Sequence, residues 1–155
     1  LRMAGSEAVF TADASATAFL QYACADYLVS PYSSLIALAD VDGAYVQTGE
    51  IRHEFRVERG QEDRYFADGT QIEEHAFKRL YQAVIGVMNS ARCEDASAAG
   101  KPWVTVTFVF SGEPYVVEYL EYDDVYCALR RDGCVDFLVR KTALMDMLDA
   151  LSSPN

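Results

Sequence analysis

The segment EYLEYDDVY, residues 118–126, holds the side chains of this chain that could most directly do chemistry. Its carboxylates could hold a hard cation such as calcium, which prefers oxygen ligands. Its tyrosines could form a recognition surface, because each phenol has an apolar ring and a polar hydroxyl. No glycine-containing loop with carboxylates at alternate positions is present, so we predict no metal site and interpret the paired aspartates as a turn. The candidate binding residues are Tyr119, Glu121, Tyr122, Asp123 and Asp124.

The two histidines have different surroundings in the sequence. His53 alternates with Ile51 and Phe55 on the inward side of an expected strand, and His75 falls in the first turn of an expected helix. Neither histidine has a ligand partner at metal spacing. For His75 the nearest candidate is Glu73, but residues two apart on a helix point in different directions. We interpret His53 as a satisfied strand histidine and His75 as an exposed helix histidine.

The four cysteines lack the C-x-x-C spacing of a zinc or redox site. If residues 132–133 close a two-residue hairpin, Cys134 faces Arg131 and Cys127 faces Leu138, which keeps the two sulfurs beyond bridging distance. We predict free thiols at all four positions, which are Cys24, Cys93, Cys127 and Cys134.

Catalytic motifs are missing from the sequence. No serine stands in a G-x-S-x-G turn, no glycine-rich loop could cradle a phosphate, and no cysteine has a histidine whose placement the sequence reveals. We therefore predict a noncatalytic protein with no catalytic residue and no cofactor.

The chain is strongly acidic, with 24 Asp and Glu against 13 Lys and Arg and a formal net charge of −11 over 155 residues. This charge disfavours nucleic acid and anionic lipid as partners. The longest apolar stretches are shorter than the roughly twenty residues of a membrane span, so no direct membrane insertion of this fragment is expected. With 51% hydrophobic residues, the chain has the composition of a protein with a packed core.

The first part of the chain reads as a helix, several strands and a second helix. We expect a linker or terminal edge at residues 1–14, a helix over 15–29, an alternating strand over 51–58 and a short strand over 64–67. Thr70 and Glu73 predict a capping box for the next helix. Its apolar stripe, at helical spacing, is Phe77, Leu80, Tyr81, Val84 and Met88, and Gly86 suggests close packing or an early end.

The second part repeats this order after a small, polar linker at residues 89–102. WVTVTFVF, YVVEYLEY, VYCALR and CVDFLV read as four strands in meander order, and a helix follows over 141–151 with Leu144, Met147, Leu148 and Leu151 on one stripe. The predicted fold class is α+β, with antiparallel sheets built from meander hairpins, each followed by a packing helix. We expect residues 15–155 to form a single domain with halves at about 15–90 and 101–152. Whether the halves are structurally equivalent stays open.

Three stretches, IRHEFRV, GTQIEEHAFKRLYQAVIGV and YLEYDDVYCALRRDGCVDFLVRKTALMDMLDAL, resemble a bacterial family of unknown function, the one numbered 4340. The resemblance covers roughly residues 35 to 151. It implies an α+β domain of similar strand and helix modules, often held outside the cytoplasmic membrane by an upstream anchor, with some relatives associated with ABC-type transport systems. It transfers no catalytic residue. Because the chain starts at Leu1 with small residues, we expect a targeting or anchoring segment upstream.

Two functional hypotheses follow from these features. The first is an extracytoplasmic, membrane-anchored domain that binds a protein or envelope component as an accessory to a membrane assembly. An exposed strand edge or the tyrosine-bearing hairpin would provide its contacts. The alternative is a domain that binds a small ligand or cation in the cleft between the two halves or at the acidic turn. The oligomeric state is left open.

Overall fold

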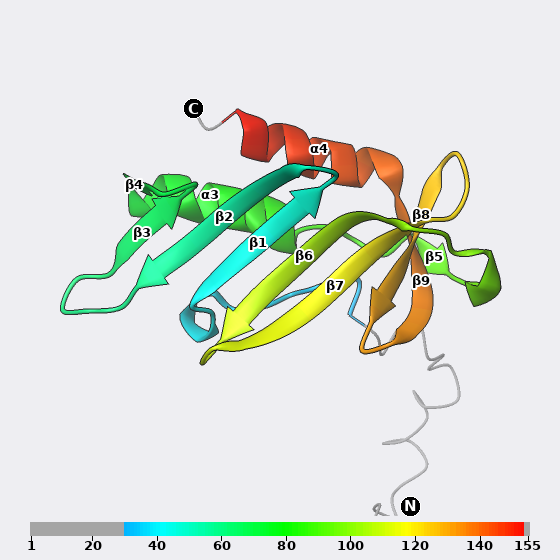
Figure 1. Ribbon diagram of the computed structural model, residues 1–155, viewed down its shortest axis with the longest axis horizontal. Coiled ribbons are helices and arrows are strands. Elements are labelled where there is room, and N and C mark those ends of the chain that lie inside the picture. The colour runs from blue at the N-terminus through cyan, green and yellow to red at the C-terminus, as the bar shows by residue number, and fades with distance from the viewer. Residues whose placement is uncertain (1–29, 154–155) are drawn as a thin grey trace, which may run out of the picture. The chain divides into compact units, whose positions relative to one another are not determined.

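Among the residues that the structure describes, the chain folds into one nine-stranded antiparallel sheet with two α-helices on one of its faces (Figure 1). The computed structural model describes residues 30–153. The predicted α+β class with an antiparallel sheet is therefore confirmed. The expected helix over 15–29, the edge at 1–14 and Cys24 lie outside the described residues. Within the described part, no helix is both long enough and apolar enough to cross a membrane.

The elements follow one another as two strand meanders, each ending in a helix. The first part contains η2 (Leu38–Asp40), β1 (Gly43–Thr48), β2 (Ile51–Glu58), β3 (Arg64–Ala67), β4 (Thr70–Ile72) and α3 (Glu74–Ile85). The second contains β5 (Ala91–Arg92), η3 (Ala96–Ala98), β6 (Pro102–Phe110), β7 (Glu113–Glu121), β8 (Tyr126–Arg131), β9 (Cys134–Arg140) and α4 (Lys141–Ser152). The strand order is β4-β3-β2-β1-β6-β7-β8-β9-β5, so β1 and β6 join the two meanders.

Tight turns with glycine at the second position link several of the hairpins. Asp68 and Gly69 have φ values of 47° and 78°, and Asp132 and Gly133 have 49° and 78°. Positive φ at both central residues is the signature of the type I′ turn, whose twist matches the twist of the flanking strands. The predicted turn at 132–133 is confirmed, and Cys134 faces Arg131 as expected.

The capping box predicted for the first described helix is wrong. Thr70 belongs to β4, where it pairs with Ala67, and Glu73 is the N-cap residue without a side-chain capping bond. The Ala67–Thr70 pair closes the tight Asp68-Gly69 turn, so Thr70 is held in an extended strand and the helix begins only at Glu74. Helix α3 ends at Ile85, and a Cβ at Gly86 would lie 2.7 Å from the Gln82 carbonyl oxygen, so the early end suggested by Gly86 is confirmed.

The core lies between the helices and the sheet face that they cover. Alternate residues of the central strands point into it, as the period of two in their sequences predicts. These strand residues are Ala44, Val46, Phe55, Val57, Val104, Val106, Phe108, Val117, Tyr119, Cys127, Leu129 and Val139. The helices contribute Phe77, Leu80, Tyr81, Val84, Leu144, Met147 and Leu151, which confirms both predicted stripes apart from Met88, which is exposed, and Leu148, which is half-buried.

The segment predicted as a linker, 89–102, contains two short elements. Strand β5 pairs with β9, η3 follows, and the Gly100 N–H donates to the Glu121 carbonyl oxygen at 2.6 Å. The free thiols predicted at Cys93, Cys127 and Cys134 are confirmed. The register predicted for one of them is wrong, because a bulge between Leu129 and Arg130 shifts the pairing and sets Cys127 opposite Val139.

Candidate functional site

The five predicted binding residues do not share one surface. Tyr119 is fully buried on the core face of β7, whereas Glu121 ends that strand and is exposed. The Asp123 carboxylate accepts hydrogen bonds from the backbone N–H groups of Val125 at 2.7 Å and Tyr126 at 2.6 Å. Asp123 therefore shapes the β7–β8 turn, as its reading as a turn residue implies.

The exposed part of that turn contains Tyr122, which is half-buried, and Asp124, which is exposed. Across residues 30–153, no three His, Cys, Asp or Glu side chains gather closely enough to hold a metal ion. The binding role of Glu121, Tyr122, Asp123 and Asp124 stays a prediction.

Tyr119 contributes a buried hydroxyl group to the core. This hydroxyl and Ser34 Oγ have no partner at hydrogen-bonding geometry, although Ser33 and Ser34 lie close to the tyrosine. Burial raises the pKa of Tyr119 to about 12. A tyrosine placed in this way serves packing, and its hydroxyl adds a desolvation cost.

We expect the Tyr119→Phe variant to fold and to match or exceed the wild-type free energy of unfolding at pH 7, by up to about 1 kcal/mol. Folded Tyr119 keeps its proton at a pH where the unfolded chain releases it, so wild-type stability falls as the pH rises from about 10 towards 12. The variant has no phenol at position 119 to lose a proton, so its free energy of unfolding should fall less over this pH range. Urea unfolding at pH 7 and pH 11 checks both points, and a variant that loses stability at pH 7 would contradict them.

One face of the sheet is left uncovered by α3 and α4. Figure 1 shows both helices behind the sheet and none in front of it. The strand registers place the following side chains on this open face: Tyr45, Gln47, Arg52, Glu54, Arg56, Glu58, Arg64, Phe66, Thr105, Thr107, Val116, Glu118, Arg130 and Arg140. Leu120 and Ala128 point to the same face but are buried, so the face is not open along the whole of β7 and β8. The sequence contained a signal for this face, because Thr105 and Thr107 alternate with buried valines.

Arginines on the open face stack on aromatic rings. The Arg52 guanidinium lies 4.0 Å from the centroid of the Tyr45 ring, and Arg56 lies 4.3 Å from that of Phe66. Such cation–π contacts hold the two planar groups against each other at the surface. The aromatic rings and arginines of the open face are therefore partly ordered before any partner arrives.

Ion pairs also connect side chains across the open face. Arg130 Nε donates to Glu118 Oε2 at 2.6 Å, which raises the pKa of the arginine, and Arg64 Nη2 lies 2.7 Å from Glu58 Oε2. Arg56 pairs with the same glutamate. The open face carries five arginines, Arg52, Arg56, Arg64, Arg130 and Arg140, against three glutamates, Glu54, Glu58 and Glu118. It is thus a basic surface on an acidic chain.

His53 forms a side-chain contact that the sequence did not reveal. Its Nδ1 lies 3.0 Å from Asp68 Oδ2, and Asp68 Oδ1 accepts a hydrogen bond from the Glu54 N–H at 2.7 Å. The two residues are brought together because the β3–β4 turn folds back beside β2. His53 is thus a paired strand histidine, as predicted, and exposed His75 lies in the first turn of α3.

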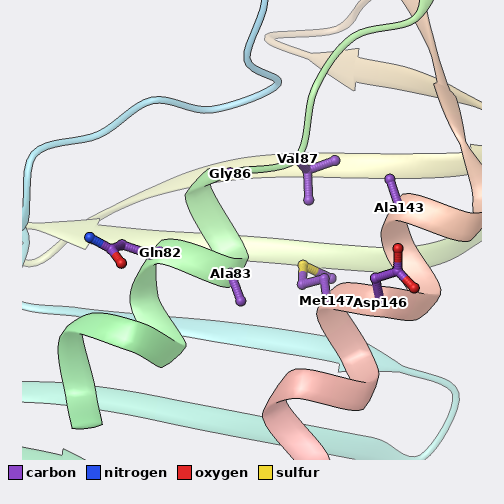
Figure 2. A pocket seen from close by; sticks show the side chains of 7 residues that line it. All are labelled: Gln82, Ala83, Gly86, Val87, Ala143, Asp146 and Met147. Atoms are coloured by element: carbon purple, nitrogen blue, oxygen red, sulfur yellow. The ribbon is translucent and has the colours of Figure 1, made fainter. Parts of the chain in front are cut away.

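Two pockets lie on the helix-covered side of the sheet. The first, of about 350 Å³, opens between the end of α3 and the start of α4, and Figure 2 shows Ala83 and Val87 on the side toward Ala143 and Met147 of α4. It is a shallow groove floored by small and apolar side chains. The second, of about 320 Å³, lies between the β3–β4 turn, the start of α3 and Leu151 of α4.

The chain was compared with protein-family models, curated proteins and solved structures, and none of them matches it.

Proposed function

We propose that this chain is a noncatalytic binding domain that recognises a protein partner through the open face of its sheet. The observation that supports the proposal most is the combination of Tyr45, Phe66 and stacked arginines on a surface that the described helices leave uncovered. Tyrosine and arginine are enriched where protein interfaces draw their binding energy. Because the stacked side chains are already ordered, binding costs less conformational entropy.

The charge of the open face favours an acidic partner surface. Arginines outnumber glutamates there, although the whole chain has a net charge of −11. A second copy docking by the same face would bring two basic surfaces together, which disfavours self-association in this mode. An acidic protein surface instead meets both the arginines and the aromatic rings.

Strand addition is a weaker mode of recognition for this sheet. The edge strands β4 and β5 contain three and two residues, so a partner strand would gain few main-chain hydrogen bonds. Side-chain contacts on the open face offer more area. We therefore place the interface on the face of the sheet and not at its edges.

The resemblance to the family numbered 4340 extends the proposal to location. In this view the domain sits outside the cytoplasmic membrane, attached through an upstream anchor, as an accessory to a transport assembly. Fractionation of cells that express the full-length protein tests this part, because recovery in the cytoplasm would remove it without affecting the interface.

The proposal also includes structural equivalence of the two strand-and-helix halves. Each half is a four-stranded meander followed by one helix, and the innermost strands, β1 and β6, are antiparallel neighbours. A two-fold axis between β1 and β6, perpendicular to the sheet, would relate halves arranged in this way. Superposition of β1–α3 on β6–α4 tests the equivalence, which fails if the helices do not overlap.

A photo-crosslinking amino acid at Thr107, on the open face, should form an adduct with an acidic protein in cells of the source organism. The same amino acid at Met145, on the exposed side of α4, serves as the control and should not give this adduct.

With the partner purified, Arg52→Glu and Tyr45→Ala should each weaken binding at least tenfold. Each removes the stacked pair, and Arg52→Glu also removes a positive charge. Titration calorimetry measures the loss.

Lys78→Glu provides the matched control, because it makes the same charge change on α3, on the other side of the sheet. It should leave the affinity for the partner within about twofold. The proposal is overturned if both positions crosslink to the same proteins, if Thr107 yields no adduct, or if the open-face variants bind as well as the wild type.

A further inference from the structure

The second pocket has an apolar interior and a polar rim. Its most buried lining residues, each at most 4% exposed, are Phe55, Leu80 and Leu151. Half-buried apolar side chains complete its wall: Ala67, Ile72 and Ala76. The exposed residues that line it are all polar: Asp68, Thr70 and Arg79. Apolar surface therefore dominates inside the pocket, and polar groups lie where the pocket meets solvent.

The charged side chains of the rim already have partners within the protein. Asp68 Oδ1 accepts a hydrogen bond from the Glu54 N–H at 2.7 Å, and Asp68 Oδ2 lies 3.0 Å from His53 Nδ1. Arg79 also takes part in an interaction with the rest of the protein. A charged ligand would therefore compete with contacts that the protein makes by itself.

The contacts of Asp68 hold one wall of the pocket in place. This wall belongs to the β3–β4 hairpin at the edge of the sheet, whose outer strand β4 contains three residues. Asp68 lies in the turn of the hairpin, where its carboxylate bonds to β2 and its N–H donates to the Glu54 carbonyl oxygen at 2.8 Å. The hairpin is thus tied to β2 before any ligand arrives, which lowers the cost of binding.

We propose that this pocket binds a small uncharged apolar molecule of one or two aromatic rings. Its rings lie against Phe55, Leu80 and Leu151, and the ring of Phe55 adds an aromatic contact. Burial of the apolar surface of the ligand is favourable, and water inside the pocket finds few polar partners to lose. A charged ligand gains less, because burying its charge among apolar side chains costs free energy.

The volume of about 320 Å³ lies at the lower end of the range for small-molecule pockets and suits a ligand of this size. The pocket lies on the helix-covered side of the sheet, whereas the proposed protein interface lies on the open face. The inference therefore goes beyond the proposed function and does not depend on it, and either can fail while the other stands.

Titration calorimetry of the full chain at neutral pH with four defined probes tests the chemical class of the ligand. Indole and toluene, which are uncharged, should bind with a Kd below about 1 mM. Benzylamine and benzoate, which carry a positive or a negative charge on a ring of the same size, should bind at least tenfold more weakly than toluene. A Kd above about 1 mM for both uncharged probes, or a charged probe that binds within tenfold of toluene, overturns the proposal.

Methyl NMR spectra of the wild-type protein test the location. Indole should shift the methyl signals of Ala67 and Ala76, because an aromatic ring in the pocket lies against both side chains. The methyl signal of Ala83, which lines the first pocket, should stay unchanged. Shifts confined to Ala83, or no shift at Ala67 and Ala76 with indole bound, place the ligand elsewhere and overturn the assignment.

Two variants that fill the pocket provide an independent check. Ala76→Leu, on α3, and Ala67→Val, on β3, should each weaken indole binding at least tenfold. Ala83→Leu is the matched control, because it enlarges another half-buried alanine of α3 outside the pocket, and its affinity should stay within about twofold of the wild type. Thermal unfolding verifies that each variant is folded. Folded filling variants with wild-type affinity, or an equal loss in Ala83→Leu, contradict the proposed site.

Discussion

Phe77→Ala is expected to lower the free energy of unfolding by about 3–5 kcal/mol, the range for removing a buried phenylalanine ring. Phe77 is 1% exposed and lies at the centre of an aromatic cluster on α3. Its ring meets Phe55 edge-on at 6.1 Å, Tyr65 at 5.1 Å and Tyr81 in a stacked arrangement at 6.3 Å between centroids. The substitution leaves a cavity that these rigid rings can fill only in part. Urea unfolding monitored by circular dichroism measures the loss.

Phe66→Ala is the matched control for this prediction. Phe66 lies on the open face, where Arg56 covers its ring, so its removal should cost less than about 1 kcal/mol. Phe77→Leu should retain part of the packing and remain measurable if Phe77→Ala does not fold. Equal losses for Phe66→Ala and Phe77→Ala would contradict the location of the core.

Cys127 is expected to resist alkylation far more strongly than Cys134. The Cys127 side chain is fully buried, and burial raises its pKa to about 11, so at pH 8 only about one thiol in a thousand is ionised. Reagents also reach it only when the structure opens, which slows the reaction further. Cys134 is exposed at the start of β9. Peptide mapping after timed iodoacetamide treatment should show modification of Cys134 at least about a thousandfold faster.

The same experiment in 8 M urea serves as the control, because unfolding should bring the alkylation rates of Cys127 and Cys134 to within a few-fold of each other. Cys93 offers a second comparison because it is partly exposed, and burial raises the pKa of its thiol. Rapid modification of Cys127 in the native protein would show that the core beside β8 is open to solvent.

Much of the sheet could be predicted from local sequence because its strands are joined mainly by tight turns. The alternation of Val104, Val106 and Phe108 with polar neighbours set the orientation of β6, and the Asp132-Gly133 pair set the β8–β9 turn. The register of Cys127 was missed by one residue, because a bulge depends on packing across strands and has no local signal. The capping box failed for a different reason, since the local Asp68-Gly69 pair closes a tight turn that holds Thr70 opposite Ala67 in a strand.

The candidate sites were harder to predict than the strands. Tyr119 and Glu121 point to the same face of β7, but Tyr119 packs in the core whereas Glu121 ends the strand and is exposed. The pocket around Asp68 and Arg79 draws its walls from three strands and two helices. Contacts of this kind are decided by how the elements pack, so composition and spacing could not reveal them.

The junction of β1 and β6 has a consequence for the folding rate. The β1–β2, β2–β3, β6–β7, β7–β8 and β8–β9 pairings each join strands that follow one another directly, whereas β1 ends at Thr48 and its other partner, β6, begins at Pro102. Closing that long loop costs chain entropy before the contacts between β1 and β6 form, and contacts between distant parts of a chain slow folding. We expect the hairpins to assemble early and the middle of the sheet to close late, so the slowest step lies at the centre of the molecule.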